Sequence, residues 1–346
     1  MQKYKKPERL REGDTVAIVS PSWGGPSVFP HIYENGLKVL REWGLKIKEF
    51  PLARMDASFL RANPQVRAKD INDAFADSEV KAIFASIGGD DSVRILPFLN
   101  KKIIADNPKI LMGYSDTSTF HVFANLQGLV SFYGPSIMAG FSQMESLPER
   151  FKSHVREMLF EPKESYKYKP YGEYCDGYPD WANKENLGKV HAMKKDDGWH
   201  WLQGTTKVRG QLFGGCMEVL EMMKATEFWP AKNFWKGKIF FLETSEEKPT
   251  IHHIDHELRN YGALGVFAQI SGLIFSRARD YSDTEKKALE EKIISIIAKE
   301  FDRPDLSIVA NFDVGHTDPQ LVLPLGIQAE IDPQKKSVRL IEPWLE

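Results

Sequence analysis

One serine stands where an apolar strand is expected to run directly into a helix. Residues 109–114 (KILMGY) predict the strand, Ser115 follows, and a helix is expected through residues 120–126. A serine on such a sharp strand-to-helix turn exposes its hydroxyl, and the next backbone N–H can stabilise an oxyanion. Thr117 replaces the second glycine of the usual motif, so only the expected geometry agrees. A plain helix N-cap is the alternative role for Ser115.

A nucleophilic serine needs a base, and two polar residues follow later predicted strands. His316 comes after the apolar run 306–311, and Glu243 ends the run 237–242. A histidine can take the serine proton while a carboxylate fixes its tautomer. The chain order Ser, Glu, His is one that hydrolases use. Each residue also has a simpler role, Glu243 as an acid near a helix start and His316 as a hydrogen-bonding loop residue.

Two glycine-rich turns could bring backbone N–H groups close to a substrate. Gly88 and Gly89 end the predicted strand 80–87 and precede Asp90. Glycine permits such close approach. The string lacks the spacing of a dinucleotide fingerprint, and the turn 20–25 lacks the lysine of a phosphate loop. Structural turns are the alternative for both.

A competing site is the string HHIDHE at 252–257. His252 and His256 are one helical turn apart and resemble an inverted zincin motif with Asp255 in place of glutamate. The sequence places no third ligand, so a solvated polar helix face is the alternative to zinc.

Strand and helix signals alternate over the first 140 residues, and the strands are continuous apolar runs. This pattern predicts a parallel sheet covered on both faces. The pattern resumes after residue 206, where Ser282 and Glu285 form a capping box and residues 328–341 predict a hairpin. We therefore expect an α/β fold with an N-terminal domain (1–160), a connecting segment (161–205) and a C-terminal domain (206–346) that has some antiparallel strands.

Residues 161–205 differ from the rest because their periodicity is poor and their aromatic content is high. Such a long segment is either a connector whose rings pack on the body or a substrate-contacting loop. Its aromatic residues are Tyr166, Tyr168, Tyr171, Tyr174, Tyr178, Trp181, Trp199 and Trp201.

Composition excludes several classes of protein. The 346 residues are 42% hydrophobic and carry a net charge of −2, which argues against disorder and against a general nucleic-acid binder. No apolar run is long enough to span a membrane, and the N-terminus lacks the apolar core of a signal peptide. Cys175 and Cys216 stand alone, which argues against a disulfide scaffold. A cytoplasmic protein is the expectation.

Taken together, the chain resembles the LD-carboxypeptidase family of serine peptidases, and most closely its microcin C immunity branch. The resemblance covers nearly the whole chain in the same order. It is carried by the strings AIVSPSWGG, SIGGDDSVRILPFL, KILMGYSDTSTFH, SFYGPSIM, GWHWLQGTTKVRGQLFGG, FLETSEE and NFDVGHTDPQLVLPLG.

The resemblance implies a Ser115–His316–Glu243 triad and an oxyanion hole from the backbone of Asp116 and the Gly88-Gly89 turn. It also implies a parallel-sheet N-terminal domain of Rossmann or flavodoxin type, a homodimer, and a reaction without metal or cofactor.

The branches of the family differ in substrate. Typical members release D-alanine from the murein tetrapeptide, whereas immunity peptidases cut the amide between an aminoacyl carboxyl and a nucleotide-like group. The aromatic segment and the string SIGGDD favour the second activity, with Trp181, Tyr178 and Asp90 as expected substrate-binding residues. Murein LD-carboxypeptidase is the alternative, followed by a non-catalytic ligand-binding protein and a zinc hydrolase.

Overall fold

The first sheet is built from short strands that are mostly apolar and buried, except for its edge strand at residues 46–49 (KIKE), which is largely exposed. In the computed structural model, which describes residues 3–346, its strand order is β14-β5-β4-β3-β1-β2. Strands β1 to β5 are parallel, and β14 pairs antiparallel with β5 although it comes from the end of the chain. The strands are β1 (Thr15–Val19), β2 (Lys46–Glu49), β3 (Val80–Ala85), β4 (Ile110–Gly113), β5 (Ser131–Tyr133) and β14 (Leu323–Leu325).

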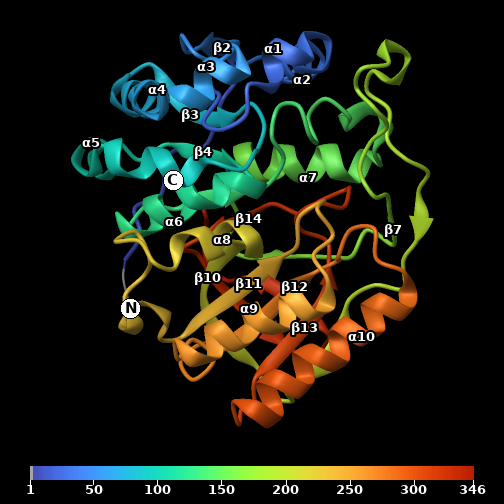
Figure 1. Ribbon diagram of the computed structural model, residues 1–346. Coiled ribbons are helices and arrows are strands. Elements are labelled where there is room, and N and C mark those ends of the chain that lie inside the picture. Colours follow the sequence, from blue (N-terminus) through green and yellow to red (C-terminus); the bar gives the residue numbers. More distant parts are fainter. Residues whose placement is uncertain (1–2) are drawn as a thin grey trace.

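Helices lie along this sheet in the upper half of the molecule (Figure 1). Their apolar positions, spaced three and four residues apart, face the sheet, as in α2, where Tyr33, Leu37 and Leu40 are buried. The helices are α1 (Gly25–Val28), α2 (Pro30–Glu42), α3 (Ala57–Ala62), α4 (Pro64–Ala76), α5 (Lys101–Asp106), α6 (Ser118–Leu126) and α7 (Glu149–Phe160).

The second sheet has eight strands in the order β6-β16-β15-β10-β11-β12-β13-β9. Its four central strands are parallel, and the outer ones pair antiparallel. The expected α/β class with antiparallel strands near the C-terminus is thus confirmed. The strands are β6 (Tyr166–Lys167), β9 (His200–Gln203), β10 (Val208–Cys216), β11 (Lys238–Glu243), β12 (Gly272–Ser276), β13 (Ser307–Phe312), β15 (Gln328–Asp332) and β16 (Ser337–Leu340).

Three helices cover this sheet in the lower half of Figure 1. They are α8 (Met217–Met223), α9 (Ile251–Ala263) and α10 (Asp283–Ile294). The capping box predicted at the start of α10 is present, because Ser282 and Glu285 each accept a hydrogen bond from the other's backbone.

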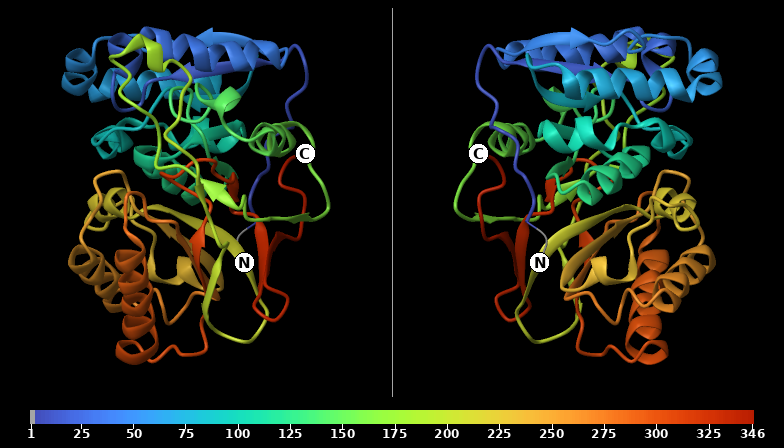
Figure 2. Two further views of the ribbon diagram at one scale, coloured as in Figure 1. Left: turned by 90° about the vertical axis from the view of Figure 1, so that its right-hand side faces the viewer. Right: turned by 90° about the vertical axis from the view of Figure 1, so that its left-hand side faces the viewer.

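The aromatic segment runs along one side of both halves and reaches helices α1 and α2 (Figure 2). Besides β6 and β9 it contains two short strands, β7 (Glu173–Tyr174) and β8 (Lys194–Lys195), and a single 3-10 turn (Lys184–Asn186). Most of its rings are buried or partly buried against the core. The segment therefore acts at least as a connector that packs on the body.

Within residues 3–346, no helix is both long enough and apolar enough to cross a membrane.

Candidate active site

Ser115 lies on the turn between β4 and α6 with a backbone conformation that non-glycine residues rarely adopt. Its φ angle is +60°, in the left-handed region. Its backbone N–H donates to the hydroxyl of Tyr133 at 3.1 Å. Local strain of this kind persists where the surrounding structure enforces it, as at nucleophile turns. The sequence expectation of a sharp strand-to-helix turn at Ser115 agrees with this geometry.

The glycine turn after β3 lies directly against this serine. A β-carbon built on Gly88 would be 3.0 Å from Oγ of Ser115 and 3.6 Å from the backbone nitrogen of Asp116. Gly89 has φ +150°, and a β-carbon there would be 2.1 Å from Oγ of Ser22. The two glycines thus allow the turn to fit between Ser115 and the loop that follows β1.

A buried ion pair keeps this glycine turn in place. The guanidinium of Arg67 donates to both carboxylate oxygens of Asp91, at 2.7 and 3.0 Å, and to the carbonyl of Pro21 at 2.9 Å. Asp116 in turn accepts from the backbone N–H groups of Asp91 and Ser92. Its carboxylate is therefore structural, and only its backbone N–H is left for the site beside Ser115.

His316 and Glu243 form a buried pair. Nδ1 of His316 lies 2.7 Å from Oε2 of Glu243, and both side chains are almost fully buried. The hydroxyl of Tyr133 donates to the other carboxylate oxygen at 2.5 Å. Gly315, at φ +91°, is needed here because a β-carbon would be 2.3 Å from Oε2. A hydrogen-bonded chain therefore runs from the Ser115 backbone through Tyr133 and Glu243 to His316.

Glu246 is a site residue that the sequence analysis missed. Its carboxylate lies 2.8 Å from Nε2 of His316, so both nitrogens of the imidazole face carboxylates. Burial disfavours the imidazolium, but Glu243 and Glu246 outweigh that effect and raise the pKa of His316 well above its usual range. The imidazolium in turn lowers the pKa of Glu246. This arrangement favours the imidazolium, the form of His316 that cannot accept a proton.

Changing Glu246 to glutamine is expected to move the acidic limb of kcat/KM to lower pH. A base works in its neutral form, and loss of one neighbouring carboxylate lowers the pKa of His316. Glu243, Arg279, Asp318 and Tyr114 remain around the ring. A pH–rate profile with an uncharged acyl substrate measures the shift. A limb that stays in place, or moves to higher pH, would show that Glu246 does not control this base.

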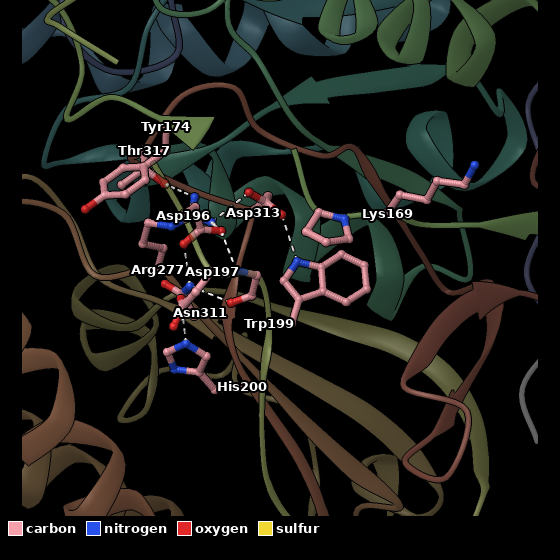
Figure 3. A network of polar contacts seen from close by, with 12 residues as sticks. Lys169, Tyr174, Asp196, Asp197, Trp199, His200, Arg277, Asn311, Asp313 and Thr317 are labelled. Carbon is pink, nitrogen blue, oxygen red and sulfur yellow. Dashed lines mark hydrogen bonds and ion pairs between the residues drawn. The ribbon is translucent and has the colours of Figure 1, made fainter. Parts of the chain in front are cut away.

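The loop that carries His316 is fastened by buried charges (Figure 3). Arg277, whose side chain is fully buried, contacts Asp313 and Asp196 at 2.8 Å each and donates to Thr317 at 3.3 Å. Nε1 of Trp199 donates to the second oxygen of Asp313 at 2.7 Å. Asp196 and Trp199 belong to the aromatic segment (residues 161–205), so these contacts connect that segment to the loop before His316.

Replacing Arg277 with alanine is expected to lower the free energy of unfolding by about 3–5 kcal/mol, because it strands two buried carboxylates. Thermal or urea unfolding measures this loss. Arg303→Ala is the matched control, because Arg303 pairs with a largely exposed Asp305 and also donates to a backbone carbonyl. Equal losses in the two variants would mean that the buried network adds nothing special.

A pocket of about 250 Å³ opens beside the nucleophile. Ser115, Gly89 and Asp90 lie in its wall, so the structure brings these three predicted residues together. The remaining lining comes from the second half of the chain, namely Cys216, Glu218, Val219, Met222, Ser245, Glu246 and Glu247. The pocket thus lies where the two halves meet.

The two aromatic residues expected to bind substrate lie against each other. The rings of Tyr178 and Trp181 stack at 4.4 Å with an angle of 14°, and Phe29 meets Trp181 edge-on at 5.7 Å. Trp181 is 7% exposed, and its Nε1 has no hydrogen-bond partner among the described residues. Burial, followed by the charge of Glu246, raises the pKa of Tyr178.

The histidine cluster on α9 does not assemble a larger ligand set. The rings of His252 and His256 are 4.2 Å apart, and His253 pairs with Glu257 at 2.9 Å. Over residues 3–346, no three or more His, Cys, Asp or Glu side chains are arranged to hold a metal ion.

Comparison with known proteins assigns similarity along most of the chain. Residues 16–134 match the LD-carboxypeptidase N-terminal domain, and residues 209–331 match the LD-carboxypeptidase C-terminal domain. The microcin C7 self-immunity protein MccF of Escherichia coli is 26% identical over 97% of this chain and 95% of its own length. A probable murein peptide carboxypeptidase of Bacillus subtilis is 25% identical over 96% of this chain and 93% of its own length.

The fold also agrees with the solved structure of an MccF protein. The microcin C7 self-immunity protein MccF in complex with aspartyl sulfamoyl adenosine superposes with a TM-score of 0.86, at 25% identity, over 99% of this chain and 100% of that one.

Proposed function

The chain belongs to the LD-carboxypeptidase family, and on this basis we propose that it is a serine hydrolase that cuts the amide between an aminoacyl or peptidyl carboxyl and a nucleotide-like group. The observation that carries the proposal is the hydrogen-bonded chain from the strained Ser115 turn through Tyr133 and Glu243 to His316. The family connection to MccF supports the choice of substrate class.

In the proposed reaction, Oγ of Ser115 attacks the scissile carbonyl while Nε2 of His316 takes the hydroxyl proton. His316 then passes this proton to the leaving nitrogen as the carbon–nitrogen bond breaks. Water, deprotonated by the same imidazole, hydrolyses the ester on Ser115 and releases the acid. Glu243 holds Nδ1 at 2.7 Å and stabilises the imidazolium that forms in each half.

The carbonyl oxygen acquires negative charge in both tetrahedral intermediates. The backbone N–H of Asp116 and the Gly88-Gly89 turn are the proposed donors, because Gly88 lies against Oγ of Ser115. Fixed backbone dipoles in such a place stabilise charge that develops during the reaction. Before the first step, Glu246 must leave Nε2 of His316, because a carboxylate 2.8 Å from that nitrogen favours the protonated ring.

Trp181 is the proposed platform for the nucleobase, with Tyr178 behind it. Replacing Trp181 with alanine should lower kcat/KM for an aminoacyl-sulfamoyl adenosine by a factor that reflects about 1–3 kcal/mol of stacking. Hydrolysis of an amide without a base should change little. Trp181→Phe is the matched control, because it keeps a ring against Tyr178 and Phe29. Equal losses on both substrates would make Trp181 a packing residue only.

The decisive experiment offers two classes of substrate side by side and identifies the products by mass spectrometry. The first is a set of aminoacyl-sulfamoyl adenosines with aspartyl, norleucyl and lysyl groups, and the second is the L-Ala-D-Glu-diaminopimelate-D-Ala tetrapeptide. Release of the amino acid from the nucleosides is the expected result. Release of D-alanine alone would instead assign the murein activity that the Bacillus subtilis relative's name indicates.

A further inference from the structure

The pocket beside Ser115 is strongly acidic. Four carboxylates lie in its wall, on three different segments of the chain, and no lysine or arginine is among its lining residues. Ser115 and the glycine turn identify this pocket as part of the proposed active site. The carboxylates indicate only the charge of the substrate group that it binds. They are Asp90, Glu218, Glu246 and Glu247.

Glu246 is paired with His316, but the protein balances the charges of Glu218 and Asp90 only weakly. Glu218 accepts from the backbone N–H and hydroxyl of Ser245, at 3.0 and 2.7 Å, and from the thiol of Cys216, and all three donors are neutral. Asp90 pairs with Arg61 at 3.6 Å, but both side chains are more than two-thirds exposed. Water and salt screen such an exposed pair. A negatively charged substrate group would therefore be repelled from this pocket.

The contact that Glu246 makes with His316 gives a further reason to expect a cationic occupant. Its carboxylate faces the pocket and is bonded to Nε2 of His316, which must be free for catalysis. Lys248 forms an ion pair with Glu285 at 3.1 Å, so it does not offer Glu246 a partner in place of His316. His316, and to a smaller extent Arg279, lowers the pKa of Glu246 by its positive charge. A positive group within the pocket would give the carboxylate a new partner away from His316.

We propose that this pocket selects substrates whose acyl group carries a positively charged side chain, such as lysyl or ornithyl. The inference rests on the proposed function, because it treats the pocket as the substrate-binding part of the Ser115 site. It separates this chain from the relative whose structure contains an aspartyl nucleoside. The four carboxylates of this pocket would attract an ammonium group, whereas the aspartyl group of that nucleoside carries a negative charge.

Binding to the full-length Ser115→Ala protein tests the inference without requiring turnover. Lysyl-sulfamoyl adenosine is compared with the norleucyl compound, which has the same chain length without the charge. Charge-assisted hydrogen bonds are expected to make the lysyl compound bind about tenfold to hundredfold more tightly, and the aspartyl compound most weakly. Equal affinity for lysyl and norleucyl compounds, or tighter binding of the aspartyl compound, would overturn the proposal.

Substitutions at Glu247 show whether the pocket is the cause. Glu247 is exposed on a loop, so Glu247→Gln and Glu247→Lys should fold normally. The first should reduce the lysyl preference, and the second should abolish or reverse it. The matched control is Glu291→Gln, which makes the same charge change as Glu247→Gln at an exposed position of α10. This variant should keep the full lysyl preference. An unchanged preference in Glu247→Lys would also overturn the proposal.

The two proposals fail in different ways. If the lysyl compound binds tightly but the wild-type protein leaves every nucleoside intact, the proposed hydrolysis is wrong and the charge selection stands. If all the nucleosides are bound and cut at similar rates, the hydrolysis stands and the charge selection is wrong.

Discussion

Replacing Ser115 with alanine is expected to lower kcat by about 10⁴–10⁶-fold, because the acyl-enzyme cannot form. The residual rate would come from the oxyanion donors and from substrate positioning. The backbone should be undisturbed, since alanine meets the same strain at φ +60° as serine does. Product formation under single-turnover conditions measures the loss. A variant with near-wild-type turnover would rule out Ser115 as the nucleophile.

A glycine at the same position separates catalysis from stability. Glycine adopts φ +60° without the steric cost that a β-carbon brings. Ser115→Gly should therefore be as inactive as the alanine variant, yet more stable than it by about 1 kcal/mol. Comparing the melting temperatures of the two variants checks the sign. A glycine variant that is less stable than the alanine variant would mean that the turn at Ser115 is not strained.

The residues of the candidate site could be predicted from the sequence where a polar residue or a glycine turn lies at the end of an apolar strand. Ser115 and the Gly88-Gly89 turn follow such strands and Glu243 ends one, and the carboxyl end of a parallel strand is where polar site residues gather. His316 was found in the same way, from the strand before it. These signals are local, so a single sequence can reveal them.

Glu246 and Tyr133 could not be found in that way. Glu246 follows Glu243 in an ordinary acidic string, and only the fold of that loop brings it to the imidazole. Tyr133 ends a buried strand as an aromatic residue, which suggests packing, and its hydroxyl meets Glu243 only after the two halves of the chain come together. These contacts join residues 70 and 110 positions apart, and neither leaves a local pattern in a single sequence.

The sequence analysis did not predict strand β10 or helix α7, and the reason differs between the two. Strand β10 contains Gly210, Gly214 and Gly215, which indicate a loop by composition. In the structure, β-carbons on Gly210 and Gly214 would be 2.2 and 1.8 Å from carbonyl oxygens of the neighbouring strand region, so the glycines allow close packing. Helix α7, by contrast, buries residues at helical spacing, a signal that was present in the sequence.

Changing Glu243 to glutamine is expected to lower kcat/KM by about 10³–10⁴-fold, the loss typical when a triad carboxylate becomes an amide. The amide can still accept from Tyr133, but an amide N–H facing Nδ1 would favour the wrong imidazole tautomer. The variant also loses the charge that stabilises the imidazolium. Kinetics at the pH optimum of each variant measure the effect. Undiminished activity would remove Glu243 from the proposed triad.

Two further substitutions on the same hydrogen-bonded chain make this result specific. Tyr133→Phe removes the other hydrogen bond to Glu243 but leaves the carboxylate on Nδ1, so its loss should be much smaller than that of Glu243→Gln. Glu246→Gln makes the same charge change on the opposite side of the imidazole, at Nε2. Because Glu246 must leave that nitrogen before it can accept a proton, this substitution should preserve activity or raise it below the pKa of His316. The two glutamates therefore have opposite roles on one ring, and equal losses in both glutamine variants would contradict that assignment.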